Sequence, residues 1–244
     1  IIKGPFYRAV AVKGDANKFA LVGGAQLLTP EMLDRKIKAL TGYAWKVSWQ
    51  SLTKLDKLNT SSEGYNALYG GMNSDETTTR LRHPNGLMAA VQKRMASEMA
   101  CYALGRDLLK PAAERLLFPR VEKDTVLYDE DGNFIQANAT RVRQNIEHLV
   151  WHLWGEKPDA YPQDVDAIYD LFTRVVDTGR AAIEADPRNW SLYYLDSDCR
   201  VTRDPVTNEA LPDDQKIERD DGVVLRAWQA VLVYMLADFK FLYE

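Results

Sequence analysis

Two histidines four residues apart have the spacing in this sequence that best suits a metal ion. His148 and His152 lie in the segment EHLVWH, and a separation of four places both on one face of a helix. A metal site needs at least a third ligand, and the chain has only one other histidine, His83. The H-E-x-x-H order of metalloproteases is absent. The pair supports a metal-dependent hydrolytic enzyme as an alternative, but ordinary helix histidines are the simpler interpretation, so we predict neither a metal site nor a cofactor.

A glycine-rich loop offers groups that could hold an anion. Glycines expose backbone amides, and hydroxyl and guanidinium groups donate hydrogen bonds to anions. The anion-binding candidate consists of Gly70, Gly71, Thr78, Arg80 and Arg82. The chain has neither a P-loop nor a G-x-G-x-x-G motif, so nucleotide binding has no specific support. Purely structural use of the same residues stays open.

An acidic run at 129–133, DEDGN, looks at first like a calcium loop. An EF-hand loop has glycine sixth and glutamate twelfth, whereas counting from Asp129 puts glycine fourth and Thr140 twelfth. Apolar residues flank the run on both sides, which predicts a β-hairpin. No G-x-S-x-G elbow occurs in the chain, so a serine hydrolase is not indicated. We predict no catalytic residue.

The two cysteines, Cys101 and Cys199, lie far apart in the sequence. Neither belongs to a C-x-x-C or C-x-x-C-H motif, which excludes a zinc ribbon and covalent haem attachment. In an oxidising compartment they could pair as one disulfide. The alternative, two unpaired thiols with Cys101 buried as a small apolar residue, stays open.

The elements that must position these residues are mainly helices. The longest predicted helix in the first half has an apolar face with a period of 3.6 residues, formed by Met88, Val91, Met95, Met99 and Tyr102. Capping residues and prolines predict the other helices. The predicted helices cover about 29–42, 63–69, 86–109, 111–118, 138–155 (capped by Asn138 or Thr140), 162–183 and 222–239.

The helices predict a mainly α fold, an orthogonal or irregular bundle with one or two small β-hairpins. We expect an extended arm or hairpin over residues 1–28. A single helical domain should follow over 29–244, with a long acidic surface loop near 186–218.

Composition and charge exclude several classes of protein. The 244 residues are 46% apolar and 27% charged, as in ordinary globular proteins. No apolar run is long enough for a transmembrane segment. Residues 1–60 carry a net charge of +6 and residues 121–244 a net charge of −12. The acidic second half argues against nucleic-acid binding. The first residues resemble neither an initiator methionine nor a signal peptide, so we expect the chain to belong to a longer or processed protein.

Several stretches resemble an uncharacterised group of large secreted bacterial proteins. They are LYGGMNSDETTTRL at 68–81, PNGLMAAVQKRMASEMAC at 84–101, LLFPRV at 116–121 and RAWQAVLVYMLADFKFLYE at the end of the chain. Domains of that group accompany c-type cytochrome-like proteins of the cell envelope. The resemblance implies a periplasmic or extracellular location, an accessory role and no catalytic residues.

These observations predict a non-catalytic envelope or periplasmic domain with a structural or docking role. Its partners would be other proteins of a larger redox or surface assembly, cytochrome-like ones among them.

Overall fold

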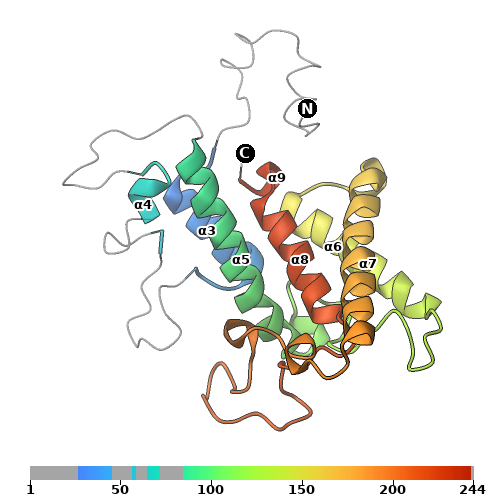
Figure 1. The fold of residues 1–244 in the computed structure, drawn as a ribbon. Coiled ribbons are helices and arrows are strands. Elements are labelled where there is room, and N and C mark those ends of the chain that lie inside the picture. The colour runs from blue at the N-terminus through green and yellow to red at the C-terminus, as the bar shows by residue number, and fades with distance from the viewer. Residues whose placement is uncertain (1–26, 46–56, 59–64, 72–84, 243–244) are drawn as a thin grey trace. The chain divides into compact units, whose positions relative to one another are not determined.

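The computed structural model describes residues 27–45, 57–58, 65–71 and 85–242 (Figure 1). These residues are mainly helical, which confirms the mainly α part of the predicted fold class. The α-helices among them are α3 (Pro30–Thr41), α4 (Tyr65–Leu68), α5 (Gly86–Leu108), α6 (Gln136–Trp154), α7 (Pro162–Ala185), α8 (Val224–Ala237) and α9 (Phe239–Leu242). Short 3-10 helices cover Ala112–Glu114, Pro158–Ala160, Trp190–Leu192 and Ser197–Cys199.

The chain divides into two compact units, where the sequence predicts one helical domain over 29–244. Unit 1 comprises residues 1–96 and 234–244, and unit 2 comprises residues 97–233. Most of the predicted arm at 1–28 lies outside the described residues. No helix in the described ranges is both long and apolar enough to cross a bilayer.

In unit 1, α3 begins and ends where its capping residues predict. The hydroxyl of Thr29 accepts a hydrogen bond from the amide of Met32 (3.0 Å), and Pro30 occupies the first helical position. Gly42 ends the helix with φ +79°, a left-handed conformation that glycine adopts without strain. The backbone amide of Leu28 donates to the carbonyl of Leu242 in α9 (3.0 Å), joining two segments far apart in sequence.

The predicted apolar face of α5 is confirmed. Met88, Val91, Met95 and Met99 are buried, while Tyr102 is half-buried. Asn85 caps the helix by accepting a hydrogen bond from the amide of Met88 (2.9 Å).

In unit 2, α6 and α7 pack against each other (Figure 1). Trp228 of α8 is fully buried in this unit. Its ring centroid lies 5.3 Å from that of Phe118 and 4.7 Å from that of Phe172 in α7. Because large aromatic side chains bury the most apolar area, these three rings form the centre of the unit 2 core.

The start of α6 differs from the prediction. The helix begins at Gln136, and neither Asn138 nor Thr140 caps it, because the Asn138 side chain instead donates to the carbonyl of Val126 (2.8 Å). Gly155 ends the helix as predicted, with φ +67°.

Two other predicted elements are shorter than expected. The helix after Pro111 is a single 3-10 turn at Ala112–Glu114. The predicted hairpin around 129–133 is reduced to one isolated antiparallel bridge between Tyr128 and Phe134. All antiparallel bridges among the described residues are isolated ones. The predicted small β-hairpins are therefore not confirmed.

The predicted acidic loop near 186–218, which we call the acidic excursion, folds back on itself without forming regular strands. Isolated antiparallel bridges join Tyr194 to Arg219, Val201 to Ile217 and Arg203 to Ala210. Val201 and Ile217 exchange backbone hydrogen bonds of 2.8 and 3.0 Å and are both buried. The excursion therefore has an apolar attachment to its own unit rather than lying free in solvent.

Candidate functional site

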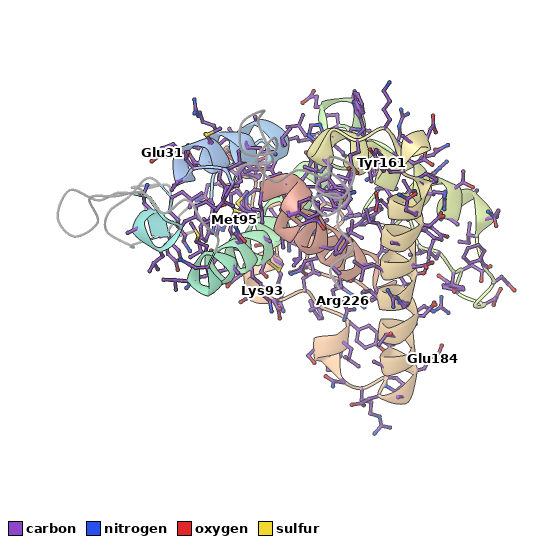
Figure 2. All side chains as sticks on the ribbon, turned by 90° about the horizontal axis from the view of Figure 1, so that it is seen from above. Glu31, Lys93, Met95, Tyr161, Glu184 and Arg226 are labelled. Atoms are coloured by element: carbon purple, nitrogen blue, oxygen red, sulfur yellow. A yellow bond between two sulfur atoms is a disulfide. The ribbon has the colours of Figure 1, made fainter. Side chains whose placement is uncertain are left out.

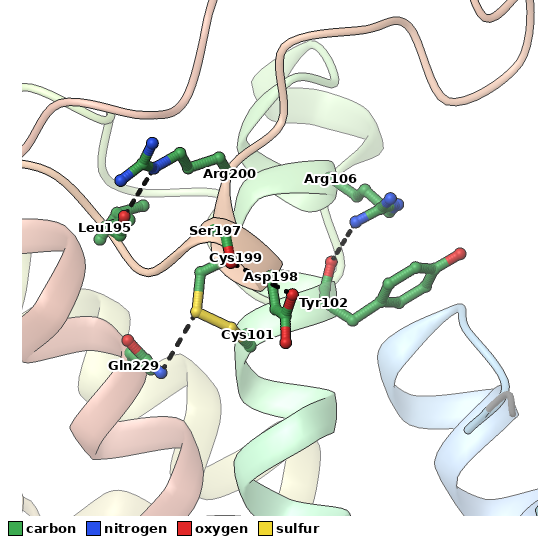
Figure 3. Close-up of a disulfide and its surroundings, with 9 residues drawn as sticks. All are labelled: Cys101, Tyr102, Arg106, Leu195, Ser197, Asp198, Cys199, Arg200 and Gln229. Atoms are coloured by element: carbon green, nitrogen blue, oxygen red, sulfur yellow. Dashed lines mark hydrogen bonds between the residues drawn. A yellow bond between two sulfur atoms is a disulfide. The ribbon is translucent and has the colours of Figure 1, made fainter. Parts of the chain in front are cut away.

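The two cysteines form a disulfide within unit 2 (Figure 3). Cys101 lies on α5 and Cys199 at the end of the 3-10 helix Ser197–Cys199, 98 residues later, with α-carbons 4.6 Å apart. The side-chain amide of Gln229 donates to the Cys199 sulfur (3.5 Å). Of the two alternatives that the sequence leaves open, the structure has the disulfide and not the two unpaired thiols. The disulfide attaches the acidic excursion covalently to α5.

A glycine one helical turn after the disulfide allows the excursion to approach α5 closely. A Cβ atom at Gly105 would lie 2.6 Å from Cγ2 of Val201, a distance that real Cβ contacts essentially never reach. Gly105 is therefore needed at this position because it has no side chain.

The two predicted metal-binding histidines stack on each other. The ring centroids of His148 and His152 lie 5.4 Å apart, and the ring planes differ by 10°. Nε2 of His148 lies 2.8 Å from the carbonyl oxygen of Leu116, and because a carbonyl can only accept, this nitrogen carries the proton. His83 lies outside the described residues. Within the described ranges, no three side chains of the metal-ligating types come together.

The environment of His148 favours its neutral form. Burial lowers the pKa of the imidazole, because the charged ring loses solvation, and the neighbouring His152 and Arg120 lower it further. The hydrogen bond to Leu116 acts in the opposite direction but does not outweigh burial. His148 is thus a neutral donor that fixes the backbone at Leu116.

Only part of the predicted anion-binding loop is described. The amide of Gly70 donates to the carbonyl of Ala67 (3.0 Å), and the amide of Gly71 donates to that of Asn66 (2.8 Å). Gly70 has φ +85°, which explains a glycine at the end of α4. Thr78, Arg80 and Arg82 lie outside the described residues. Anion binding here stays a prediction.

A buried carboxylate organises the segment after α5, and no motif marks this residue in the sequence. Asp107 has no exposed surface, and its oxygens accept hydrogen bonds from the amides of Leu116, Leu117 and Phe118 at 2.9–3.1 Å. Lys110 lies 3.4 Å from the same carboxylate. A carboxylate that accepts several amides is well compensated for its loss of water.

Two further side chains hold the same segment. Asn145 of α6 is fully buried, accepts from the amide of Arg120 (3.1 Å) and donates to the carbonyl of Leu117 (3.0 Å). Arg115 donates to the carbonyls of Lys110 (2.7 Å) and Val121 (2.8 Å). These side chains bond backbone groups of a segment that is irregular where a helix was predicted.

Unit 2 has a groove of about 610 Å³, which we call the α7 groove. It lies at the C-terminal end of α7, the end marked by Glu184 in Figure 2. The segment between Asp124 and Ile135 and the turn before α8 form the rest of its walls. Its lining residues are Asp124, Val126, Tyr128, Asp129, Glu130, Ile135, Arg180, Ile183, Glu184, Asp221 and Gly222.

The α7 groove combines apolar walls with an excess of negative charge. Five of the lining residues named above are acidic and one is basic. The guanidinium carbon of that basic residue, Arg180, lies 4.1 Å from the ring centroid of Tyr128, where it stacks on the aromatic face. The Tyr128 hydroxyl donates to Asp177 (3.0 Å). Burial and that carboxylate raise the pKa of Tyr128, so the phenol stays protonated.

The carboxylates of the groove differ in what they already bind. Asp129 accepts from the backbone and side-chain amides of Asn133 (2.7 and 3.1 Å), which lowers the pKa of Asp129. Asp221 pairs with Arg219 (2.9 Å). Within the described part of the chain, no ion pair or side-chain hydrogen bond engages Asp124, Glu130 or Glu184. These three carboxylates are exposed and can contact a ligand.

Residues that line this groove have features in the sequence that predict local structure and not a binding site. The run 129–133 predicts a turn, and Ile183 ends the helix predicted over 162–183, so each has a purely structural reason to be present. Ile183 is in fact half-buried and lines the groove. Comparison of the chain with protein-family models, with curated proteins and with solved structures found no match.

Proposed function

We propose that this chain is a non-catalytic docking domain of the cell envelope, periplasmic or extracellular, and an accessory subunit of a larger assembly. The resemblance noted in the sequence suggests a redox or surface assembly with cytochrome-like partners. The disulfide supports the location, because disulfides persist in oxidising compartments and are rare in the cytosol.

The observation that carries the docking role is the exposure of two tryptophans in unit 2. Trp151 on α6 is 54% exposed and Trp190, just after α7, is 71% exposed. Tryptophan is the residue most enriched among the side chains that dominate binding energy at protein interfaces. An exposed tryptophan on a rigid helix costs little conformational entropy when a partner covers it.

Site-specific crosslinking in the producing cell tests the docking role. A photoreactive amino acid would replace Trp151 or Trp190, with Glu114 as a matched exposed control position in the same unit. We expect one discrete adduct from each tryptophan position and none from the control. If all three positions give only the uncrosslinked chain, or the same smear of adducts, the docking role is wrong.

The thiol state in intact cells tests the location. Cys101 and Cys199 would be alkylated with a maleimide-polyethylene glycol reagent under denaturing conditions, with and without prior reduction. We expect no mass shift without reduction and a shift for two thiols after it. A double shift without reduction would place the chain in a reducing compartment.

A further inference from the structure

We propose that the α7 groove is the docking surface for a basic, partly apolar segment of a partner protein. This inference rests on the proposed docking function and names the surface and the chemistry of the partner. The occupant would be an extended segment in which lysine or arginine side chains alternate with aliphatic or aromatic ones.

The apolar part of the groove calls for apolar side chains. Val126, Ile135 and Ile183 line it and are each half-buried, so they leave apolar surface open to a ligand. The ring of Tyr128 continues this surface, and Phe134, which packs edge-on against Tyr128 at 5.6 Å, is 47% exposed. Covering such surface releases water and is favourable.

The charged part of the groove calls for cations. Asp124, Glu130 and Glu184 come from three different positions around the groove and, in the described part of the chain, engage no basic side chain. Arg180 is the groove's own cation, and it stacks on Tyr128. Lysine or arginine side chains of a partner would meet carboxylates whose charge is not yet neutralised, which is the charge complementarity typical of protein interfaces.

A second hollow next to the α7 groove extends the site, so that it can hold more than a small molecule. This hollow, of about 310 Å³, shares Asp124, Val126, Asp221 and Gly222 with the α7 groove. Its basic side chains are already engaged: Lys216 pairs with Asp213 (2.5 Å), and Arg219 with Asp221. Lys123 donates to the backbone carbonyl of Asp214. The two hollows share four lining residues, and the basic side chains of the second hollow are held by contacts within the chain. Together they suit a chain segment better than a compact ligand.

A fluorescent peptide of alternating lysine and leucine is the probe, with two control peptides. One control replaces lysine by glutamate, and the other replaces leucine by serine. The full chain would be titrated into each at low and at near-physiological salt, and binding read from fluorescence anisotropy. We expect saturable binding of the lysine–leucine peptide only.

Substitutions then locate the binding. The double variant Glu130→Gln/Glu184→Gln should raise the Kd about tenfold, since two exposed ion pairs are each worth a few-fold in affinity. Ile183→Ala should raise it several-fold at both salt concentrations. The matched control Asp159→Asn/Glu209→Gln removes the same charge from exposed positions outside the groove and should leave the Kd unchanged. Thermal unfolding of each variant checks that it folds.

Three results would overturn the inference. Equal losses in the groove and control double variants would mean unspecific attraction to an acidic protein. Equal binding of the lysine–serine peptide would mean that the apolar walls play no part and that any polycation suffices. The absence of saturable binding to the lysine–leucine peptide would also overturn it.

Crosslinking separates this inference from the docking function itself. A photoreactive residue at Glu184 should give the same partner adduct as one at Trp190. If Trp151 and Trp190 give an adduct but Glu184 and Glu130 do not, the docking role stands and the groove is not its surface. If none of these positions gives an adduct, both proposals fail.

Discussion

Gly179 of α7 lies directly against the side chain of Val223, the residue before α8. A Cβ atom at position 179 would lie 2.4 Å from Cγ1 of Val223, closer than real Cβ contacts come. Val223 is buried and has φ +60°, a conformation that β-branched residues rarely adopt. Such a conformation costs on the order of 1–3 kcal/mol and persists only where the surroundings fix it. The valine therefore cannot easily move to make room.

Gly179→Ala should destabilise the protein by about 1–3 kcal/mol, the usual cost of overpacking a filled site. Urea unfolding followed by circular dichroism would measure the loss. Gly86→Ala is the control, because a Cβ there meets nothing within 4 Å and alanine favours a helix. If both variants lose equal stability, the close packing on Val223 is not the cause.

Loss of the disulfide should destabilise the protein by about 4 kcal/mol, because the bond closes a loop of 98 residues in the unfolded chain. Urea unfolding of the Cys101→Ser/Cys199→Ser double variant would measure this. Reduction of the wild-type protein should produce the same loss, and adding a reductant to the double variant should change nothing. A reductant effect on the double variant would point to a cause other than this bond.

Asp107→Ala should destabilise the protein by about 3–5 kcal/mol, because three amides, two of them buried, would lose their acceptor. Asp107→Asn keeps one oxygen and should cost less. Urea unfolding of both variants would show which one loses more free energy of unfolding, and that comparison is the test. If asparagine costs as much as alanine, the oxygen that asparagine keeps does not stabilise the fold by accepting these hydrogen bonds.

The helices could be predicted from the sequence because their signals are local. Thr29, Pro30 and Gly42 fix the limits of α3 by their own hydrogen bonding and backbone preferences. The segment after Pro111 could not be predicted in this way. Its conformation depends on Asp107 and Asn145, which lie outside the segment and reach it only in the folded structure.

The candidate groove depends on the fold in the same way. Glu130, Glu184 and Asp221 are separated by dozens of residues, so no motif connects them in the sequence. The disulfide could be predicted only in part. The sequence identifies the two cysteines as candidates, but their pairing depends on the fold, which brings the acidic excursion next to α5.

The His148 imidazole makes folding stability depend on pH in mildly acidic conditions. Burial lowers its pKa below the ordinary value of 6.5, so between these two pKa values the unfolded chain binds more protons than the folded one. The stability is therefore fully present above pH 6.5 and is lost as the pH falls through 6.5 towards the folded pKa. His148→Gln can still donate to the Leu116 carbonyl but does not titrate, so it should flatten the pH dependence with little loss at neutral pH. Urea midpoints for the two proteins between about pH 5 and pH 8 would measure this, and parallel curves would show that another group is responsible.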